Sequence, residues 1–223
     1  MKKIAIYPSI LSADFSRLKE EILLVEKAGA DGIHLDVMDG HFVPNISFGP
    51  VVVCSIRKVT DLPFWAHLMI EEPDKYLEVF KDCGVEGIVV HPETGKDLSF
   101  LADKIHDLGL KAGVALNPET GIEVIENVLN RFERILIMTV HPGFGGQSFL
   151  PELLKKITAL KDMIASLPRP SFIEVDGGIN LRTAPQVVNA GADILVIGSA
   201  IFRADDPASA LMAIRNEVEK ERK

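Results

Sequence analysis

The sequence lacks several features that would place it in common classes of protein. It has no surplus of basic residues, since 24 Lys and Arg stand against 32 Asp and Glu and the formal net charge is −8. Nucleic-acid binders need a basic surface, so we expect no nucleic-acid partner. No stretch approaches the roughly 20 apolar residues of a membrane span, and no signal-peptide pattern begins the chain, so we expect no membrane partner.

Cysteine is scarce as well. The only two, Cys54 and Cys83, lie in helix-like segments far apart in the sequence. We therefore expect no disulfide framework. Both thiols should have a structural role, and the location should be cytoplasmic. Linkers and low-complexity stretches are also missing, and 223 residues suffice for one good-sized core. We expect a single domain over residues 1–223.

One local pattern recurs along the chain: a helix end, a glycine, a short turn and a β-branched run. It is seen in AGADGIHLDV (28–37), CGVEGIVVHP (83–92), LGLKAGVALNP (108–118) and AGADILVIGS (190–199). Glycine can end a helix in the left-handed conformation, which a Cβ would penalise. The apolar run that follows is typical of a strand buried on both faces.

Eight strands are predicted on this basis. They centre on residues 4–9, 32–38, 64–70, 87–92, 112–117, 134–140, 172–177 and 193–198. Helix-like segments alternate with them, for example 15–30, 73–84, 153–167 and 207–223. Strict alternation requires a parallel sheet. Eight units in this length, with no GxGxxG motif, favour an α/β fold of the closed (β/α)8 TIM-barrel type over an open sheet.

The segment HLDVMDG (34–40) has an unusual polar face. As a strand it places His34, Asp36 and Met38 on one side and the aliphatic Leu35 and Val37 on the other. The aliphatic side suits the outside of a barrel, beneath the helices, so the first three should point inward. Barrel interiors are normally filled by Val, Ile and Leu, and active sites lie at the C-terminal ends of the strands.

Three further strands bring candidates to the same end. One places Trp65, His67 and Met69 on one face, and two others end with Met138 and Asp176. A lone inward histidine is more often a hydrogen-bonded core residue, and methionines are common core fillers. Convergence of several polar groups instead favours a catalytic site or a divalent transition metal, with the donor set His34, Asp36, His67 and Asp176. Glu174 should also turn inward, one layer deeper, as a hydrogen-bonding support.

Glycine-rich loops follow the last three strands. They are HPGFGGQSF (141–149), DGGIN (176–180) and IGSAIF (197–202). Loops after strands seven and eight, with a short helix N-terminus, are the usual phosphate site of such barrels. Arg182 and Arg203 come just after these loops, and no Lys or Arg lies inside them. We therefore expect backbone amides and a helix dipole, rather than cations, to hold a phosphate.

Taken together, these motifs resemble the ribulose-phosphate 3-epimerase family. The resemblance covers essentially the whole chain and rests on SILSADF (9–15), HLDVMDGHFVPNISFGP (34–50), HLMI (67–70), HPGFGGQSF and EVDGGIN (174–180). It implies a TIM barrel of the ribulose-phosphate-binding type and interconversion of D-ribulose 5-phosphate and D-xylulose 5-phosphate. It also implies a small phosphorylated ketose substrate, one divalent metal ion (Zn, Fe(II), Mn or Co) and assembly as a homo-oligomer.

The resemblance assigns roles to individual residues. The metal ligands would be His34, Asp36, His67 and Asp176, and the two aspartates would also be the catalytic acid–base pair. The residues expected to bind substrate, the glycines chiefly its phosphate, are Ser9, His67, Met38, Met69, Met138, Gly143, Phe144, Gly145, Gly146, Gly177, Gly178, Gly198 and Ser199.

The chemistry fits these residues. Inversion of a carbon next to a ketone needs proton removal from one face and delivery to the other, which two opposed carboxylates can perform through an enediolate. A metal would stabilise its charge. Acid–base groups work best with a pKa near the operating pH, so at least one aspartate should have a raised pKa.

Three other functions stay open. An allulose-6-phosphate 3-epimerase shares the motif at 34–50, and HPET (91–94) and NPET (117–120) occur in that branch too. Retention of PGFGGQ and DGGI favours the pentose phosphate. A hydrolase could use Asp36 as the base for a metal-activated water, although nothing in the sequence points to such a water or to a scissile bond. A phosphosugar-binding barrel with a structural metal is the non-catalytic alternative.

Overall fold

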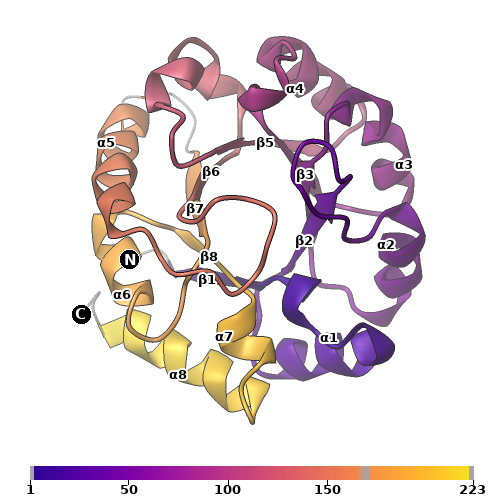
Figure 1. The fold of residues 1–223 in the computed structure, drawn as a ribbon, viewed down its shortest axis with the longest axis vertical. Coiled ribbons are helices and arrows are strands. Elements are labelled where there is room, and N and C mark those ends of the chain that lie inside the picture. Colours follow the sequence, from indigo (N-terminus) through magenta and orange to yellow (C-terminus); the bar gives the residue numbers. More distant parts are fainter. Residues whose placement is uncertain (1–2, 166, 168–170, 221–223) are drawn as a thin grey trace.

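The computed structural model describes residues 3–165, 167 and 171–220, and its strands form one parallel barrel surrounded by helices (Figure 1). The eight strands are β1 Ala5–Pro8, β2 Ile33–Met38, β3 Phe64–Met69, β4 Gly87–Val90, β5 Lys111–Leu116, β6 Arg134–Met138, β7 Phe172–Asp176 and β8 Ile194–Ile197. All eight predicted strands are confirmed. Several end one or two residues earlier than expected, because the chain already turns into the loops of the barrel mouth.

Helices follow the strands and cover the outside of the barrel (Figure 1). They are α1 Leu18–Lys27, α2 Pro50–Ile56, α3 Leu77–Asp82, α4 Leu98–Asp107, α5 Leu154–Ile164, α6 Ala184–Ala190, α7 Ser199–Phe202 and α8 Pro207–Lys220. Short 3-10 helices lie at Ile10–Ser12, Phe15–Arg17, Arg57–Val59, Pro73–Lys75, Pro92–Thr94 and Pro151–Leu153, and a longer one, Ile122–Arg131, connects β5 to β6. The helices expected at 15–30, 73–84, 153–167 and 207–223 are confirmed within the described residues. In that part of the chain, no helix combines the length and apolarity needed to cross a membrane.

The sheet closes almost completely. Its hydrogen-bonded order runs β1-β8-β7-β6-β5-β4-β3-β2, so β1 and β2 are the two ends of the ladder. These two strands meet through a single parallel bridge between Ser9 and His34. The seam of the barrel therefore lies at two residues that the sequence assigns to the functional site.

Two separate apolar layers confirm which way the strand side chains point. Leu35 and Val37 belong to the large core between the strands and the helices. Trp65 and Met138 belong to a smaller cluster inside the barrel. The alternation along β2 and β3 therefore sends their polar residues inward, as the period of two predicts.

The expectation of no disulfide is wrong. The structure joins Cys54, in α2, to Cys83, directly after α3, with their Cα atoms 4.4 Å apart. The two cysteines are 29 positions apart in the sequence, on either side of one β–α unit. Successive helices of such a barrel are neighbours on its outer surface, so distance along the chain was a poor guide to distance in space.

Candidate active site

Three donor atoms converge at the mouth of the barrel. Oδ1 of Asp36 lies 3.2 Å from His34 Nε2 and 3.1 Å from His67 Nδ1, and the two nitrogens are 3.3 Å apart. The alternation of β2 turns His34 and Asp36 to the same side, and the parallel register places Asp36 beside His67 on β3. Asp176, at the end of β7, adds a fourth donor, and all four ligand atoms lie within 4.8 Å of one another.

This donor set fits one divalent metal ion. Two imidazoles and two carboxylates are ligands that Zn²⁺ and related ions accept. Both histidines are fully buried. Burial lowers the pKa of His67 to about 4, so this imidazole is neutral at pH 7 and has a lone pair for a metal. The structure thus brings together the four residues predicted as ligands.

The two aspartates have opposite electrostatic environments. Burial would raise the pKa of Asp36, but the charge on His34 and the hydrogen bond from His34 oppose it and hold that pKa well below its usual value. Burial, and then the charge of Asp36, raise the pKa of Asp176 to about 8. At neutral pH, without a metal, Asp36 is therefore ionised and Asp176 is protonated. This agrees with the expectation that at least one aspartate has a raised pKa.

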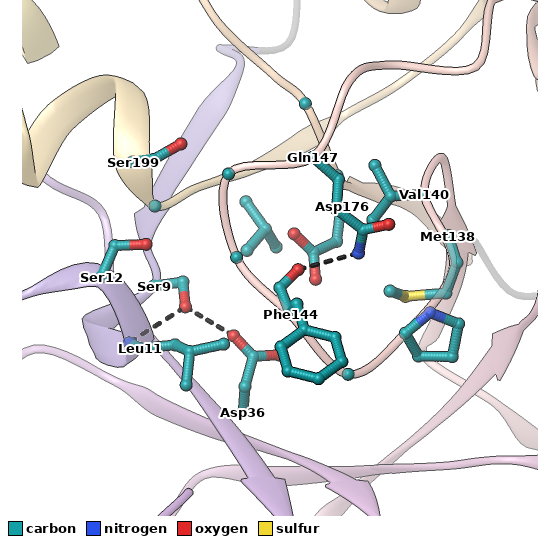
Figure 2. A pocket seen from close by; sticks show the side chains of 18 of the residues that line it. Ser9, Leu11, Ser12, Asp36, Met138, Val140, Phe144, Gln147, Asp176 and Ser199 are labelled. Carbon is teal, nitrogen blue, oxygen red and sulfur yellow. Dashed lines mark hydrogen bonds between the residues drawn. The ribbon is translucent and has the colours of Figure 1, made fainter. Parts of the chain in front are cut away.

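Ser9 holds the second oxygen of Asp36. Its hydroxyl donates to Asp36 Oδ2 at 2.5 Å and accepts the backbone N–H of Leu11 at 3.3 Å (Figure 2). Oδ2 therefore points toward Ser9, on the β1 side of the cavity, and Oδ1 points toward the two histidines. Ser9 thus fixes the orientation of the carboxylate.

A cavity lies above the cluster, and Asp36 and Asp176 both border it (Figure 2). Twelve of the thirteen predicted substrate-binding residues line it, namely Ser9, Met38, Met69, Met138, Gly143, Phe144, Gly145, Gly146, Gly177, Gly178, Gly198 and Ser199. His67 does not line it and lies beneath, as does His34. A contact of His67 with substrate stays a prediction.

The glycine loops need glycine for two physical reasons. Gly146 and Gly178 have φ of +78° and +66°, where a Cβ is disfavoured. A Cβ on Gly178 would also lie 2.5 Å from the backbone nitrogen of Phe149, so the loops after β6 and β7 interlock. Among the described residues that line the cavity there is no Lys or Arg. Arg203 lies beside the loop, with Nη1 3.2 Å from the position a Cβ of Gly146 would take.

Sequence reasoning missed several residues that line the cavity: Leu11, Ser12, Val140, His141, Pro142, Gln147, Ile179 and Val196. Ser12 is the most informative, because its Oγ lies 2.8 Å from where a Cβ of Gly198 would stand. Gln147 braces its own loop by donating to the carbonyls of His141 and Phe144, at 2.6 and 2.9 Å. Both residues lie inside quoted motifs, but nothing in those motifs distinguishes a cavity hydroxyl from a turn residue.

Glu174 supports His34 from below. Its Oε1 lies 3.4 Å from His34 Nδ1 and 3.3 Å from Arg134 Nη1. Arg134 in turn donates to the hydroxyl of Tyr7 at 2.8 Å. The carboxylate is fully buried and accepts hydrogen bonds from Arg134. It turns inward as the sequence predicts, and its hydrogen-bonding support of His34 stays a prediction.

Comparison with known proteins points to one family. The model of the ribulose-phosphate 3-epimerase family matches residues 5–202. A ribulose-phosphate 3-epimerase of Bacillus subtilis (strain 168) is 51% identical over 213 residues, which are 95% of this chain and 98% of the relative. The chloroplastic ribulose-5-phosphate-3-epimerase of Arabidopsis thaliana is 48% identical, over 95% of this chain and 76% of the relative.

Solved structures support the fold. KGPDC from Streptococcus mutans aligns with a TM-score of 0.74 at 14% identity, covering 98% of this chain and 99% of the other. A 3-hexulose-6-phosphate synthase aligns with a TM-score of 0.72 at 20% identity, covering 96% and 100%. At such identities the likeness concerns the barrel alone.

Proposed function

Because the chain belongs to the ribulose-phosphate 3-epimerase family, we propose that it interconverts D-ribulose 5-phosphate and D-xylulose 5-phosphate. The observation that carries this proposal is the placement of Asp36 and Asp176. They come from β2 and β7 and border one cavity, and without a metal they differ in protonation at neutral pH. Inversion at carbon 3 needs one carboxylate that takes a proton and another that gives one.

The two aspartates would exchange roles in each turnover. The ionised carboxylate of Asp36 takes the proton from one face of carbon 3, and an enediolate forms. Asp176 then delivers its own proton to the opposite face. Asp36 ends protonated and Asp176 ionised, which is the state needed for the reverse reaction. Both groups regain their starting state by exchanging protons with water. Ser9 keeps Asp36 Oδ2 in a fixed place during this cycle.

The residues that would hold a divalent ion are His34, Asp36, His67 and Asp176. Such an ion supplies Lewis-acid stabilisation of the negative charge that develops on the sugar oxygens. Zn²⁺, Fe²⁺, Mn²⁺ and Co²⁺ all accept this donor set. The buried neutral His67 and the ionised Asp36 suit a cation better than they suit an apolar core.

The rest of the cavity suits a phosphorylated ketose. Met38, Met69 and Met138 offer apolar, non-acidic contacts that cannot protonate an enediolate. The glycine loops and the start of α7 present backbone N–H groups to a phosphate, without a cation in the cavity lining that the structure describes.

A deuterium-exchange assay tests the proposed function. Protein loaded with a divalent metal, in D₂O, should exchange the C3 proton of ribulose 5-phosphate and form xylulose 5-phosphate. Faster turnover of allulose 6-phosphate would favour the hexulose alternative. Release of inorganic phosphate would favour a hydrolase, and binding without exchange a non-catalytic barrel.

Three broader features belong to the same proposal. We infer that residues 1–223 act as one catalytic domain, that copies of the chain assemble as a homo-oligomer, and that the protein works in the cytoplasm.

A further inference from the structure

His67 lies between the metal donors and another buried histidine. Its Nδ1 faces Asp36 and His34, and its Nε2 lies 2.7 Å from Nε2 of His91. The ring planes differ by 20° and the ring centroids are 5.0 Å apart. Because the nitrogens are much closer than the centroids, the rings meet edge to edge in nearly one plane. This is the geometry of a hydrogen bond between them, and both rings are fully buried.

The contact continues to Glu93. Nδ1 of His91 lies 3.0 Å from Glu93 Oε2. The other oxygen, Oε1, accepts the backbone N–H of Asn117 at 2.9 Å and the hydroxyl of Thr120. Burial would raise the pKa of Glu93, but the hydrogen bonds from His91 and Thr120 and the backbone N–H outweigh it and lower that pKa to about 2. Glu93 is therefore an ionised carboxylate at neutral pH.

His67, His91 and Glu93 form a hydrogen-bonded row, and the ionised carboxylate at its end fixes the direction of both hydrogen bonds in it. It can only accept, so Nδ1 of His91 must carry a proton. A single hydrogen bond joins Nε2 of His91 to Nε2 of His67 at 2.7 Å, so one of these nitrogens must accept. When the proton of His91 is on Nδ1, its Nε2 is the acceptor and Nε2 of His67 donates to it. The proton of His67 is thus on Nε2, and Nδ1 keeps the lone pair that faces Asp36 and His34.

We propose that Glu93 and His91 are positioning residues, which hold His67 in the Nε2–H form and keep its Nδ1 free to bind a metal. The proposal rests on the proposed function only in requiring a divalent ion at this site. Hydrogen-bond partners of this kind commonly fix the tautomer and the ring orientation of a ligating histidine. His34 has Glu174 directly behind it, whereas His67 reaches its carboxylate through a second imidazole.

The variant Glu93→Gln should reverse the direction of the hydrogen bonds between His67, His91 and residue 93, because glutamine has almost the same shape as glutamate but can donate. The donors from Asn117 and Thr120 keep an oxygen in the Oε1 position, so the amide nitrogen faces His91. The amide donates there, which moves the proton of His91 to Nε2. That proton in turn favours the Nδ1–H form of His67, in which the metal-binding nitrogen is blocked.

Glu133→Gln is a matched control. Glu133 also pairs with a histidine, since its Oε2 lies 3.1 Å from His106 Nε2. Glu133 directly precedes β6 and so lies at the opposite end of the barrel from the site. The same substitution in the same kind of pair should leave the metal site unchanged.

Two measurements without sugar test the proposal. In the Zn²⁺-loaded protein, long-range ¹H–¹⁵N NMR correlations should place protons on His67 Nε2 and His91 Nδ1. Competition with a chelator should show Zn²⁺ binding weakened about 10- to 100-fold in Glu93→Gln, the usual effect of losing such a support, and unchanged in Glu133→Gln. Should Glu93→Gln fail to fold, His91→Phe, which accepts no hydrogen bond, should also weaken Zn²⁺ binding.

A proton on His91 Nε2 in the loaded wild type would overturn the proposal. So would wild-type Zn²⁺ affinity in the folded Glu93 or His91 variant, or an equal loss in Glu133→Gln. These readouts do not depend on turnover. If Zn²⁺ binding and the tautomers are as expected but the protein does not epimerise ribulose 5-phosphate, the proposed activity is wrong. The positioning role of Glu93 and His91 would still hold.

Discussion

Asp36, in β2, and Asp176, at the end of β7, border the same cavity and carry opposite protonation at neutral pH in the metal-free protein. The cause is local. The charge on His34 and its hydrogen bond keep the pKa of Asp36 low, whereas burial and then the charge of Asp36 raise the pKa of Asp176. One site thus holds a proton acceptor and a proton donor from the same residue type.

The raised pKa of Asp176 makes a prediction about stability and pH. Its pKa is about 8 in the folded metal-free protein, against ~3.9 in an unfolded chain. Between these values the folded state binds more protons, so this group's contribution to stability is fully present below about pH 4 and is lost as the pH rises toward 8. The variant Asp176→Asn has no carboxyl group here and so does not lose this stability as the pH rises. In thermal melts of chelated samples, the melting temperature of the variant should rise relative to that of the wild type between pH 5.5 and pH 8.5. A difference in melting temperature that does not change with pH would contradict the assigned pKa.

The glycine loop predicts a substrate-binding defect. Gly146→Val should raise KM about tenfold or more, since a side chain at φ +78° strains the loop and crowds an anion held by amides. Gly109→Val is the control, because Gly109 has the same φ of +78° but open space around it and directly precedes Leu110 and β5, away from the cavity. Arg203→Ala should change KM much less than Gly146→Val. A larger effect of the arginine would mean that a cation, and not the amides, holds the phosphate.

Two serines at the cavity should affect different kinetic constants. Ser9→Ala removes the hydroxyl that holds Asp36 Oδ2, so kcat should fall about tenfold, as expected for a hydrogen bond to a charged group. Ser12→Ala changes the side of the cavity next to Gly198 and should mainly raise KM. Steady-state kinetics of both variants separate the two effects. The same change in both variants would argue against distinct roles for the two hydroxyls.

The cysteine pair should be independent of catalysis. Cys54 and Cys83 join α2 to the end of α3, on the outside of the barrel and away from the residues that line the cavity. Thiol titration of unfolded protein should find no free thiols after oxidation and two after treatment with a reductant. Turnover should be the same in both samples. A change of kcat on reduction would show that the outer helices communicate with the mouth.

The sequence was sufficient to predict the fold because its signals are local. Each glycine followed by a β-branched run marks a helix end and the next strand, and the alternation in β2 and β3 separates His34 and His67 from the aliphatic outer face. Parallel register then forces the inward residues of different strands to the same end. The four-residue donor set could be proposed from these rules alone.

Other features depended on contacts between distant segments. The pairing of Cys54 with Cys83 needs the spacing of two helices on the barrel surface. The row from His67 through His91 to Glu93 needs the exact direction of three side chains and donors from the loop after β5. HPET and NPET were visible as motifs, but no local rule connects them to a buried imidazole.

The two-base inversion is the central claim, and single carboxamide substitutions test it most directly. Asp36→Asn and Asp176→Asn should each nearly abolish formation of the other epimer, because each removes one of the two groups needed for inversion. The remaining carboxylate can still take and return a proton on its own face. Metal content must be matched in both variants, since Asn is a poorer ligand than Asp and loss of the ion would mimic loss of the base.

The decisive measurement is exchange of the C3 proton in D₂O, followed by NMR, with ribulose 5-phosphate and xylulose 5-phosphate offered separately to the two metal-loaded variants. The two-base account predicts that each variant exchanges the proton of one epimer, and that Asp36→Asn and Asp176→Asn act on opposite epimers. Exchange of the same epimer by both variants would contradict it, because a single base would then serve both faces.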